Sequence, residues 1–542
     1  MKIKAISVAL ALSIFSVSAA FADDDIQVHL DGNPIEFDQN PIILNERTMV
    51  PIRAIFEAMG YEVKWNQDTQ TASAFKGEDY IIVTENSPEI EYKLNGVTDI
   101  YICDVPAQIV SERMLVPVRA ISESAGLNVG WNGETMTVDI TSPVLFSYEG
   151  SFGERSYVMN YTDELFDESA SIYNSKLSST ALEFAFAGFT SNESETERDK
   201  NIKGLYKSLG FTGIETHGYD VPLTDSSDKA AYSIAYKDCG DKTVAVLVVR
   251  GGGYGAEWSS NFNVGTEAYH TGFYTAASEI TSAARDYLAG LAADGRENIK
   301  LLVTGYSRGA AIADIIAANL ISEDSYDVYA YTFAAPQWID SSRDSIYTGN
   351  FSQIFNVVSR GDIVPQIPLS IWGYGRLGTD IYLDELIKSA DTAKINSYFA
   401  SLTGSDNVPL YISTVTDTTA NDTIIDLFCI STPTLELYNT ELEENLKQAC
   451  ATADASPSDL GTVIFDHITG QIGRLYESGE LSEFLTRHNI SNGQIAAGIF
   501  SAIFFGSIDL NTLGISFDNV GPAHTPEVYL STLLYAAKVN EQ

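Results

Sequence analysis

Short apolar runs alternate with longer amphipathic stretches between residues 244 and 358. Runs of this kind are typical of parallel strands that are buried on both faces of a sheet. They span residues 244–249, 301–304, 328–333 and 354–358. Between the first two, residues 274–291 place their apolar side chains at helical spacing. This order predicts an α/β fold with a doubly wound sheet.

The first 140 residues show an internal repeat instead. The segment 47–54, RTMVPIRA, recurs as 113–120, RMLVPVRA, at an offset of 113 − 47 = 66 residues. A glycine and a tryptophan recur at the same offset, namely Gly60 and Trp65 at Gly126 and Trp131. Each copy predicts a short helix that begins at its proline and ends at its glycine, followed by a strand such as 61–65. We therefore predict a small α+β tandem-repeat domain.

The N-terminus has the features of an export signal. Lys2 and Lys4 precede an apolar run over residues 5–17, and Ala20-Phe21-Ala22 has the small-x-small pattern of a cleavage site. The run is too short to span a bilayer. We expect residues 1–22 to be a signal peptide and the protein to be secreted or extracellular. Attachment to the cell wall is one form that this location can take. No transmembrane anchor is expected.

Composition narrows the range of partners. The formal net charge of −41 argues against nucleic acid and anionic bilayers as partners and favours a neutral ligand or substrate. Four cysteines in an exported chain allow disulfides, and Cys429 and Cys450 are the closest pair in sequence. A disulfide between these two and free buried thiols both remain open.

One motif carries chemistry. Gly305-Tyr306-Ser307-Arg308-Gly309 follows the predicted strand 301–304 directly and opens the helix-forming segment 310–318. A nucleophile elbow needs both glycines, because strand and helix approach closely at a strained turn, and it needs the strand and the helix themselves. All are present, so we predict that Ser307 is a nucleophile.

A serine nucleophile requires a histidine base that is oriented by a carboxylate. In α/β-hydrolases the acid follows the serine, and the base follows the acid. Asp362 comes just after the apolar run 354–358 and is the predicted acid. It could instead be a turn or capping residue. Its rivals as the acid are Asp340, Asp344 and Asp380.

Three histidines follow Asp362 in the chain. His524 lies in a loop ahead of a final predicted helix over residues 529–537, which suits a side chain that must reach the elbow. His488 follows a charged helical segment, and His467 lies among apolar and acidic residues. These two are more simply surface or core histidines, so His524 is the predicted base.

These motifs resemble those of the class 3, fungal-type lipases. The resemblance covers residues 240–385 and 520–535, and its marks besides the elbow are Arg250-Gly251, Trp258, His270-Thr-Gly-Phe273, Tyr331–Pro336 and Gly361–Pro365. It implies an α/β-hydrolase fold, with backbone N–H groups of Gly252 and Arg308 forming the oxyanion hole, and a packing role for His270. Tyr306 and Arg308 replace the family's usual His and Leu, and Arg308 brings a cation beside the oxyanion site.

Residues 26–140 resemble the copper amine oxidase N-terminal-like domain, on the Val-Pro-x-Arg-Ala and Trp positions of both copies. The name does not imply copper here. His29 is the segment's only histidine and falls opposite Lys93 in the second copy, so it makes a poor metal site. Arg53 and Arg119 are interpreted as structural. We predict no metal and no cofactor, and the repeats are candidates for contact with cell wall or matrix.

The domain organisation follows from these assignments. Residues 23–142 form the repeat domain, and residues 143–542 form the α/β-hydrolase domain. Asp362 and His524 lie 524 − 362 = 162 residues apart, which predicts a mainly helical insertion over about 385–515. Within it, the apolar stretch 495–510 is either a buried core helix or a cap over Ser307. As a cap it would line an acyl-binding pocket with Ile499, Phe500, Ile503 and Phe504.

Two hypotheses follow. The first is a secreted serine carboxylic ester hydrolase, a lipase or esterase that acts through a Ser-Asp-His triad and an acyl-enzyme. The second is a surface or matrix binding protein that keeps a non-catalytic hydrolase-like domain, since fold alone does not establish function.

Overall fold

The computed structural model describes most of the chain outside the region 405–522. The described residues are 26–94, 96–133, 135–150, 153–159, 161–189, 198–220, 228–252, 257–322, 326–340, 342–343, 347, 349–387, 392–404, 422, 425–426, 428–429, 432–450, 463–464, 467, 477–487 and 523–539. The predicted signal peptide and the stretch 495–510 lie outside them. The chain forms two compact units, one of residues 1–92 and 100–142 and one of residues 93–99 and 143–542.

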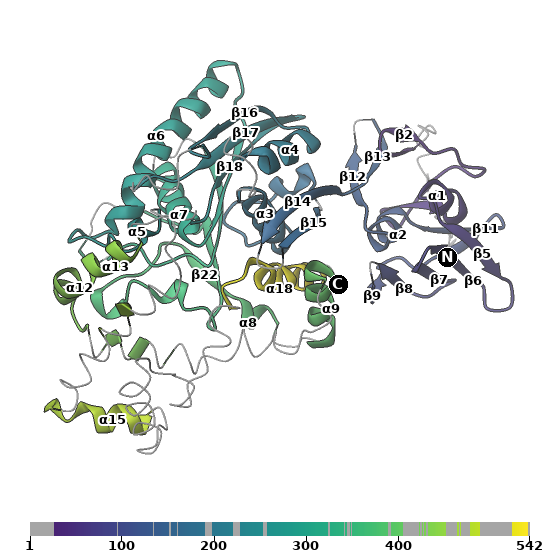
Figure 1. Cartoon of the computed structure of the whole chain (residues 1–542). Helices are drawn as coiled ribbons and strands as arrows, with labels where there is room; N and C mark the ends of the chain where they lie inside the picture. The colour runs from purple at the N-terminus through teal and green to yellow at the C-terminus, as the bar shows by residue number, and fades with distance from the viewer. Residues whose placement is uncertain are drawn as a thin grey trace, which may run out of the picture. The chain divides into compact units, whose positions relative to one another are not determined.

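The first unit is rich in strands and has two similar halves (Figure 1). Strand β4 (Arg47–Pro51) runs into helix α1 (Ile52–Ala58), and β11 (Arg113–Pro117) runs into α2 (Val118–Ser124). The two helices thus begin 118 − 52 = 66 residues apart. Each follows a proline, whose fixed φ suits entry to a helix. Strands β4 and β11 pair antiparallel, with Val116 opposite Val50.

Three sheets make up this unit. Their strand orders are β12-β13-β1-β2, β10-β11-β4-β3 and β5-β6-β7-β8-β9. The remaining strands are β1 (Gln27–Leu30), β2 (Asn33–Pro34), β3 (Ile42–Leu44), β5 (Glu62–Asn66), β6 (Thr71–Lys76), β7 (Asp79–Thr84), β8 (Glu89–Leu94), β9 (Val97–Ile102), β10 (Gln108–Val110), β12 (Asn128–Asn132) and β13 (Thr137–Thr141).

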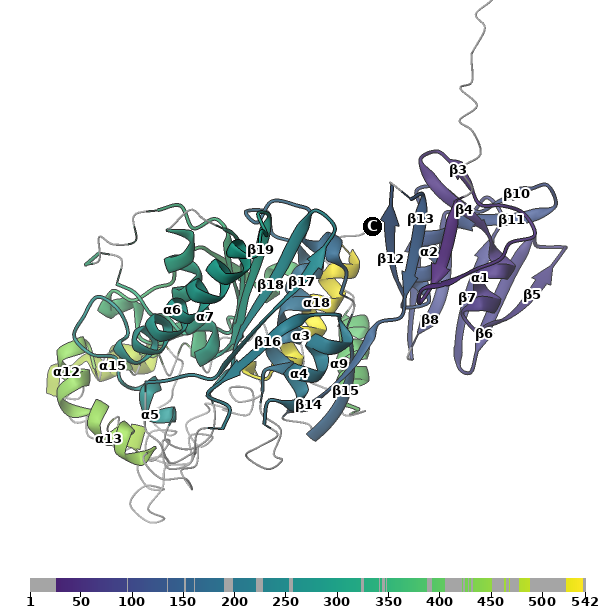
Figure 2. The same ribbon diagram turned by 90° about the horizontal axis from the view of Figure 1, so that it is seen from above.

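The second unit is built on one seven-stranded sheet whose strand order is β16 to β22 in sequence (Figure 2). Strands β18 to β22 are parallel, and β16 and β17 extend the sheet antiparallel. The strands are β16 (Thr212–His217), β17 (Tyr232–Cys239), β18 (Lys242–Val249), β19 (Ile299–Tyr306), β20 (Asp327–Phe333), β21 (Ile354–Val358) and β22 (Thr379–Tyr382). A separate hairpin pairs β14 (Val144–Gly150) with β15 (Gly153–Met159).

Helices cover both faces of this sheet. The side chains of α6 (Thr271–Ala293) and α7 (Arg308–Ile321) form one apolar cluster with the sheet. Those of α3 (Ser175–Ala187), α4 (Lys200–Ser208) and α18 (Pro526–Val539) form another cluster on the opposite face (Figures 1 and 2). The long apolar strands are therefore buried on both sides, as their composition predicts.

The prediction of a doubly wound sheet is wrong. Each parallel strand lies beside the one that precedes it in the chain, so the sheet is wound in one direction only. The helices on the second face come from outside the parallel run, namely α3 and α4 before it and α18 at the C-terminus. Apolar strands reveal that both faces are covered, but not which helices cover them.

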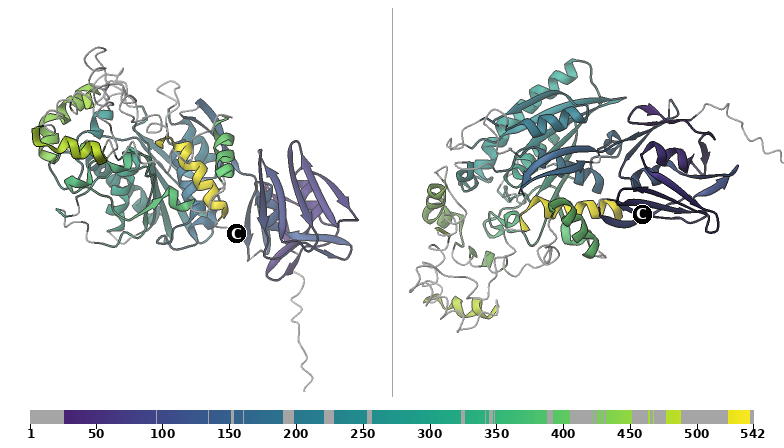
Figure 3. Two further views of the ribbon diagram at one scale, coloured as in Figure 1. Left: turned by 90° about the horizontal axis from the view of Figure 1, so that it is seen from below. Right: turned by 45° about the vertical axis from the view of Figure 1, so that its right-hand side comes forward.

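The remaining described helices are short. They are η1 (Asp163–Phe166), α5 (Glu257–Asn261), η3 (Val364–Gln366), η4 (Ser370–Trp372), α8 (Leu383–Leu386), α9 (Thr392–Thr403), α12 (Leu435–Glu441), α13 (Glu443–Ala449) and α15 (Glu480–Arg487). Figure 3 shows α9 beside α18, where Ile395 and Phe399 join the same apolar cluster as Leu530. Among the described helices, none has the length and apolar character that a membrane crossing needs.

Candidate active site

The elbow at Ser307 joins β19 to α7 with very little space. Ser307 has φ 57° and ψ −128°, a sparsely populated conformation for a residue with a side chain. A Cβ on Gly305 would lie 2.5 Å from the carbonyl oxygen of Gly309, and a Cβ on Gly309 would lie 2.5 Å from that of Val249. Both glycines are therefore required by close backbone approach.

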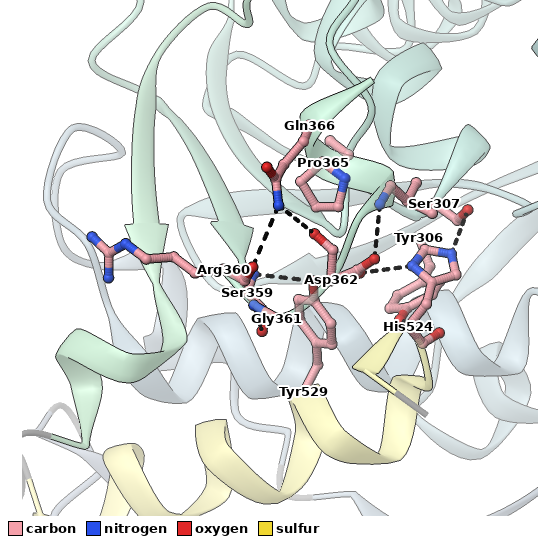
Figure 4. Close-up of polar contacts among 12 residues, drawn as sticks. Tyr306, Ser307, Ser359, Arg360, Gly361, Asp362, Pro365, Gln366, His524 and Tyr529 are labelled. Carbon is pink, nitrogen blue, oxygen red and sulfur yellow. Dashed lines mark hydrogen bonds and ion pairs between the residues drawn. The ribbon is translucent and has the colours of Figure 1, made fainter. Parts of the chain in front are cut away.

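The structure brings the three predicted triad residues together (Figure 4). His524 Nε2 lies 2.9 Å from Ser307 Oγ, and His524 Nδ1 lies 2.7 Å from Asp362 Oδ2. A carboxylate only accepts hydrogen bonds, so Nδ1 carries the proton and donates it, which leaves Nε2 to accept from the serine hydroxyl. This is the arrangement in which a histidine can remove the serine proton.

Asp362 is fully buried and receives several donors. Besides His524, Tyr529 Oη donates to Oδ2 at 2.8 Å, and the N–H of Val364 donates to Oδ1 at 2.9 Å. Tyr529 Oη also accepts from the N–H of Ser359 at 3.1 Å. Burial first, and then the charge of Asp362, raise the pKa of Tyr529 well above its usual range, so this hydroxyl stays a neutral donor.

The backbone of His524 is anchored by the residue that precedes the nucleophile. Tyr306 Oη donates to the carbonyl oxygen of His524 at 3.0 Å, and the two rings lie 5.3 Å apart. Tyr306 also packs edge-on against Tyr529. The tyrosine that replaces the usual histidine of the elbow thus supports the base.

The rival candidates have other partners. The carboxylate of Asp340 accepts from Ser342, and that of Asp380 binds Arg376. His467 Nε2 lies 3.0 Å from Thr432 Oγ1. Asp344 and His488 lie outside the described residues, as do Ile499, Phe500, Ile503 and Phe504 of the predicted acyl pocket.

Of the two predicted oxyanion donors, one follows β18 and the other begins α7. Gly252 follows β18, and no atom within 4 Å would meet a Cβ there. Arg308 is the first residue of α7, where backbone N–H groups favour negative charge. The N–H of Arg308 thus directly follows the nucleophile in the chain, and Gly252 stays a predicted donor.

The side chain of Arg308 is buried, with an exposed fraction of 2%. Its Nη2 donates to Ser260 Oγ of α5 at 3.0 Å. The expected cation beside the elbow is therefore directed into the protein and connects α7 to α5. It belongs to the packing of the site rather than to an exposed binding surface.

His270 has a structural role, as the family resemblance implies. It is fully buried at the start of α6, where Nδ1 accepts from the N–H of Phe273 and Nε2 donates to the carbonyl oxygen of Asn261. Burial, together with the charge of Arg308, lowers the pKa of His270 to about 3. The ring is therefore neutral and caps the helix.

Helices α12 and α13 of the predicted insertion contact the segment that follows α5. Tyr438 Oη donates to the carbonyl oxygen of Phe262 at 3.0 Å, and Asn439 Nδ2 donates to that of Gly265 at 2.9 Å. Val264 packs with Tyr438 and Leu446 in one apolar cluster. Part of the insertion therefore fixes the chain between α5 and α6.

No metal centre is evident in the described part of the chain, where no group of three or more His, Cys, Asp or Glu side chains could hold an ion. His29 instead lies 3.4 Å from Asp139. The four cysteines are all described, and all are free thiols. Of the two alternatives for Cys429 and Cys450, the structure therefore has the free thiols.

Sequence reasoning missed the supporting residues of this site, above all Tyr529. It lies in the predicted final helix, five positions after His524, and its spacing is that of any aromatic residue that packs a helix onto a core. No local pattern distinguishes a core tyrosine from one whose hydroxyl reaches a carboxylate.

Two protein-family models match segments of the chain. Residues 240–372 match the family model of Lipase (class 3), and residues 29–140 match that of the copper amine oxidase N-terminal domain. Both resemblances seen in the sequence are confirmed. Residues 240–372 are thus similar to class 3 lipases, and residues 29–140 are similar to copper amine oxidase N-terminal domains. A comparison with curated proteins finds no match.

The chain is also similar, at low sequence identity, to several solved structures of lipases. A triacylglycerol lipase with a serine protease triad is 18% identical, with a TM-score of 0.26, over 32% of this chain and 66% of that one, so this chain spans just under two thirds of its length. The Rhizomucor miehei triacylglyceride lipase is 17% identical over 41% and 80% of the chains, with a TM-score of 0.28. The Aspergillus oryzae mono- and diacylglycerol lipase is 18% identical over 39% and 80%, with a TM-score of 0.27.

Proposed function

We propose that this protein is a secreted serine carboxylic ester hydrolase of lipase or esterase type. The observation that carries the proposal is the pair of hydrogen bonds at His524, 2.9 Å to Ser307 Oγ and 2.7 Å to Asp362 Oδ2. It coincides with the strained backbone of Ser307 at the junction of β19 and α7. A serine that only packs a turn needs neither feature.

The proposed reaction has two stages. Ser307 Oγ attacks the ester carbonyl carbon while His524 Nε2 takes its proton, and this proton then passes to the leaving alcohol as the C–O bond breaks. Water, deprotonated by His524, next attacks the acyl-enzyme and releases the acid. Asp362 holds the imidazole in the required tautomer. Backbone N–H groups of Gly252 and Arg308 stabilise each oxyanion, and each such donor contributes about 3–4 kcal/mol in related reactions.

Single substitutions test this assignment. We expect Ser307→Ala to fold normally and to lose about 10⁴- to 10⁶-fold in turnover of p-nitrophenyl esters. His524→Ala should be nearly as inactive, whereas His467→Ala and His488→Ala should keep their activity. Normal turnover by Ser307→Ala would refute the proposal. A wild-type protein that binds matrix material but turns over no ester would favour the non-catalytic alternative.

We also propose how the rest of the chain serves this activity. Residues 1–22 would direct export, and the two repeats of residues 23–142 would attach the enzyme to cell wall or matrix. A mainly helical insertion over about 385–515 would shape the substrate site. A truncated protein that begins near residue 144 should then fold and hydrolyse small soluble esters, while losing retention on cell-wall material. An insoluble or inactive truncation would contradict a separable repeat domain.

A further inference from the structure

Arg376 binds the loop that carries Asp362, and only 9% of its side chain is exposed. Its Nη1 donates to two backbone carbonyl oxygens, that of Ala335 at 3.0 Å and that of Pro365. Its Nε and Nη2 donate to the two carboxylate oxygens of Asp380 at 3.1 and 2.6 Å. One guanidinium thus binds three separate segments, namely the loops that follow β20 and β21 and the beginning of β22.

The segments that it joins include the turn of the catalytic acid. Ala335 follows β20, and Pro365 lies three residues after Asp362 in the loop that follows β21. The same turn is closed by the bond from the N–H of Val364 to Asp362 Oδ1. Arg376 therefore holds this turn at Pro365, whereas Asp362, at the start of the same turn, binds His524. Hydrogen bonds from a charged donor are roughly twice as strong as neutral ones.

Charged and titratable groups reach Arg376 from each neighbouring element. Asp380 pairs with it from β22, and Asp314 lies near it on α7. Burial raises the pKa of Asp314 to about 8, and the charge of Arg376 acts against this rise. Tyr529 of α18 also experiences the charge of Arg376, which opposes the rise in its pKa that burial causes.

We propose that Arg376 is a positioning residue of the hydrolytic site, which fixes the turn of Asp362 so that this carboxylate meets His524. This inference rests on the proposed function. A lysine cannot replace it fully, because the planar guanidinium satisfies two carbonyls and a carboxylate at once, whereas an ammonium presents a single point of charge.

The experiment compares Arg376→Lys and Arg376→Met with the matched control Arg296→Met. Arg296 also forms a two-pronged pair with an aspartate, Asp238, but at the opposite end of the strands. The readouts are the rate at which a p-nitrophenyl alkylphosphonate labels Ser307, kcat and KM on p-nitrophenyl acetate, both from pH 5 to 9, and the melting temperature. Labelling requires an activated serine but no ester substrate.

In Arg376→Met, we expect kcat and the labelling rate to fall by about 10²-fold with little change in KM, since a displacement of about 1 Å at a reacting group costs this much. Both the labelling rate and kcat fall on the acid side of their pH profiles when the imidazole of His524 is protonated. This acid limb should move to higher pH in Arg376→Met, because loss of a cation favours the protonated imidazole. Arg376→Lys should recover part of the rate and keep the limb in place. Wild-type kinetics in a folded Arg376→Met, or an equal loss in Arg296→Met, overturns the proposal.

A second variant decides the question even if Arg376→Met does not fold. Asp380→Asn leaves the two carbonyl contacts in place and unmasks the cation. Its rates should fall less than about fivefold, the effect of a partly exposed pair, and its acid limb should move to lower pH. If Asp380→Asn keeps the wild-type pH profile and Arg376→Lys keeps wild-type rates, the proposal is overturned.

The outcomes also separate this inference from the proposed function. If the wild-type protein labels at Ser307 but hydrolyses no ester, the proposed function fails and Arg376 is judged on labelling rates alone. If Ser307 does not label at all, there is no activated serine for Arg376 to support, and both fail.

Discussion

Gly309 offers the sharpest test of the geometry around the nucleophile. The residue is the second of α7, so Gly309→Ala should favour the helix by up to about 1 kcal/mol from intrinsic propensity alone. The surroundings oppose this gain. The added Cβ would lie 2.5 Å from the carbonyl oxygens of both Val249 and Arg250, at the end of β18. Because these are backbone atoms, no side chain can rotate away to relieve the contact.

The size of the effect follows from these distances. Carbon and oxygen atoms in favourable contact lie about 3.5 Å apart, so strand and helix must separate by roughly 1 Å. Overpacking of this kind costs about 1–3 kcal/mol of stability. Gly252, the proposed oxyanion donor, lies only two residues beyond Arg250. A displacement of this size at a reacting group lowers the rate by about 10²-fold.

The assay measures kcat/KM on p-nitrophenyl acetate together with thermal unfolding. Gly290→Ala is the matched control, because this glycine lies within α6 and a Cβ there would meet no atom within 4 Å. The control should keep its activity and unfold at the same or a higher temperature. If Gly309→Ala retained wild-type kcat/KM and stability, the close approach of β18 and α7 would be wrong.

Two further predictions concern buried polar groups. Tyr529→Phe removes a neutral donor from Asp362 and should lower kcat/KM about tenfold or more, since a hydrogen bond to a charged group contributes about 1.5–3 kcal/mol. The control is Tyr206→Phe, which removes a buried hydroxyl bound to Ser233 and should lower only the melting temperature. If the two variants lowered kcat/KM equally, a specific role for Tyr529 would be contradicted. Burial lowers the pKa of His270 to about 3, from a value near 6.5 in the unfolded chain. As the pH falls from 6.5 to 3, only the unfolded chain binds this proton. The free energy of unfolding, which is highest above pH 6.5, therefore decreases by about 1.4 kcal/mol for each pH unit. Urea unfolding at pH 7 and 5 should show this loss, about 2 kcal/mol, in the wild type but not in His270→Gln, and the same pH dependence in both would refute it.

Local patterns in the sequence were enough to predict the elements that build the site. The apolar runs at 244–249, 301–304, 328–333 and 354–358 coincide with β18 to β21, because strands buried on both faces can hardly contain polar residues. The elbow was predictable because its glycines, its strand and its helix are contiguous. Chain order limited the acid and the base to residues after Ser307, and their positions after a strand and ahead of the final helix selected Asp362 and His524. The structure brings these two to hydrogen-bonding distance of one another.

Other features depend on contacts between residues that are distant in the chain. The single winding direction of the sheet, the antiparallel strands β16 and β17 and the covering of one face by α3, α4 and α18 are decided by packing, which leaves no periodic signal in any one segment. The direction of the Arg308 side chain toward Ser260 is of the same kind.

The partners of the catalytic acid show this division most clearly. Asp362 could be predicted as an acid from the strand that precedes it. Tyr529, in contrast, lies 529 − 362 = 167 residues away. Arg376 binds backbone carbonyls, which every residue has, so its contacts leave no mark in the sequence. The sequence by itself determined the candidate residues for the proposed ester hydrolysis, because that chemistry requires particular side chains in a particular order. Only the tertiary structure decided which other side chains hold them in place, because any buried polar group of suitable length and direction satisfies a carboxylate or a carbonyl equally well.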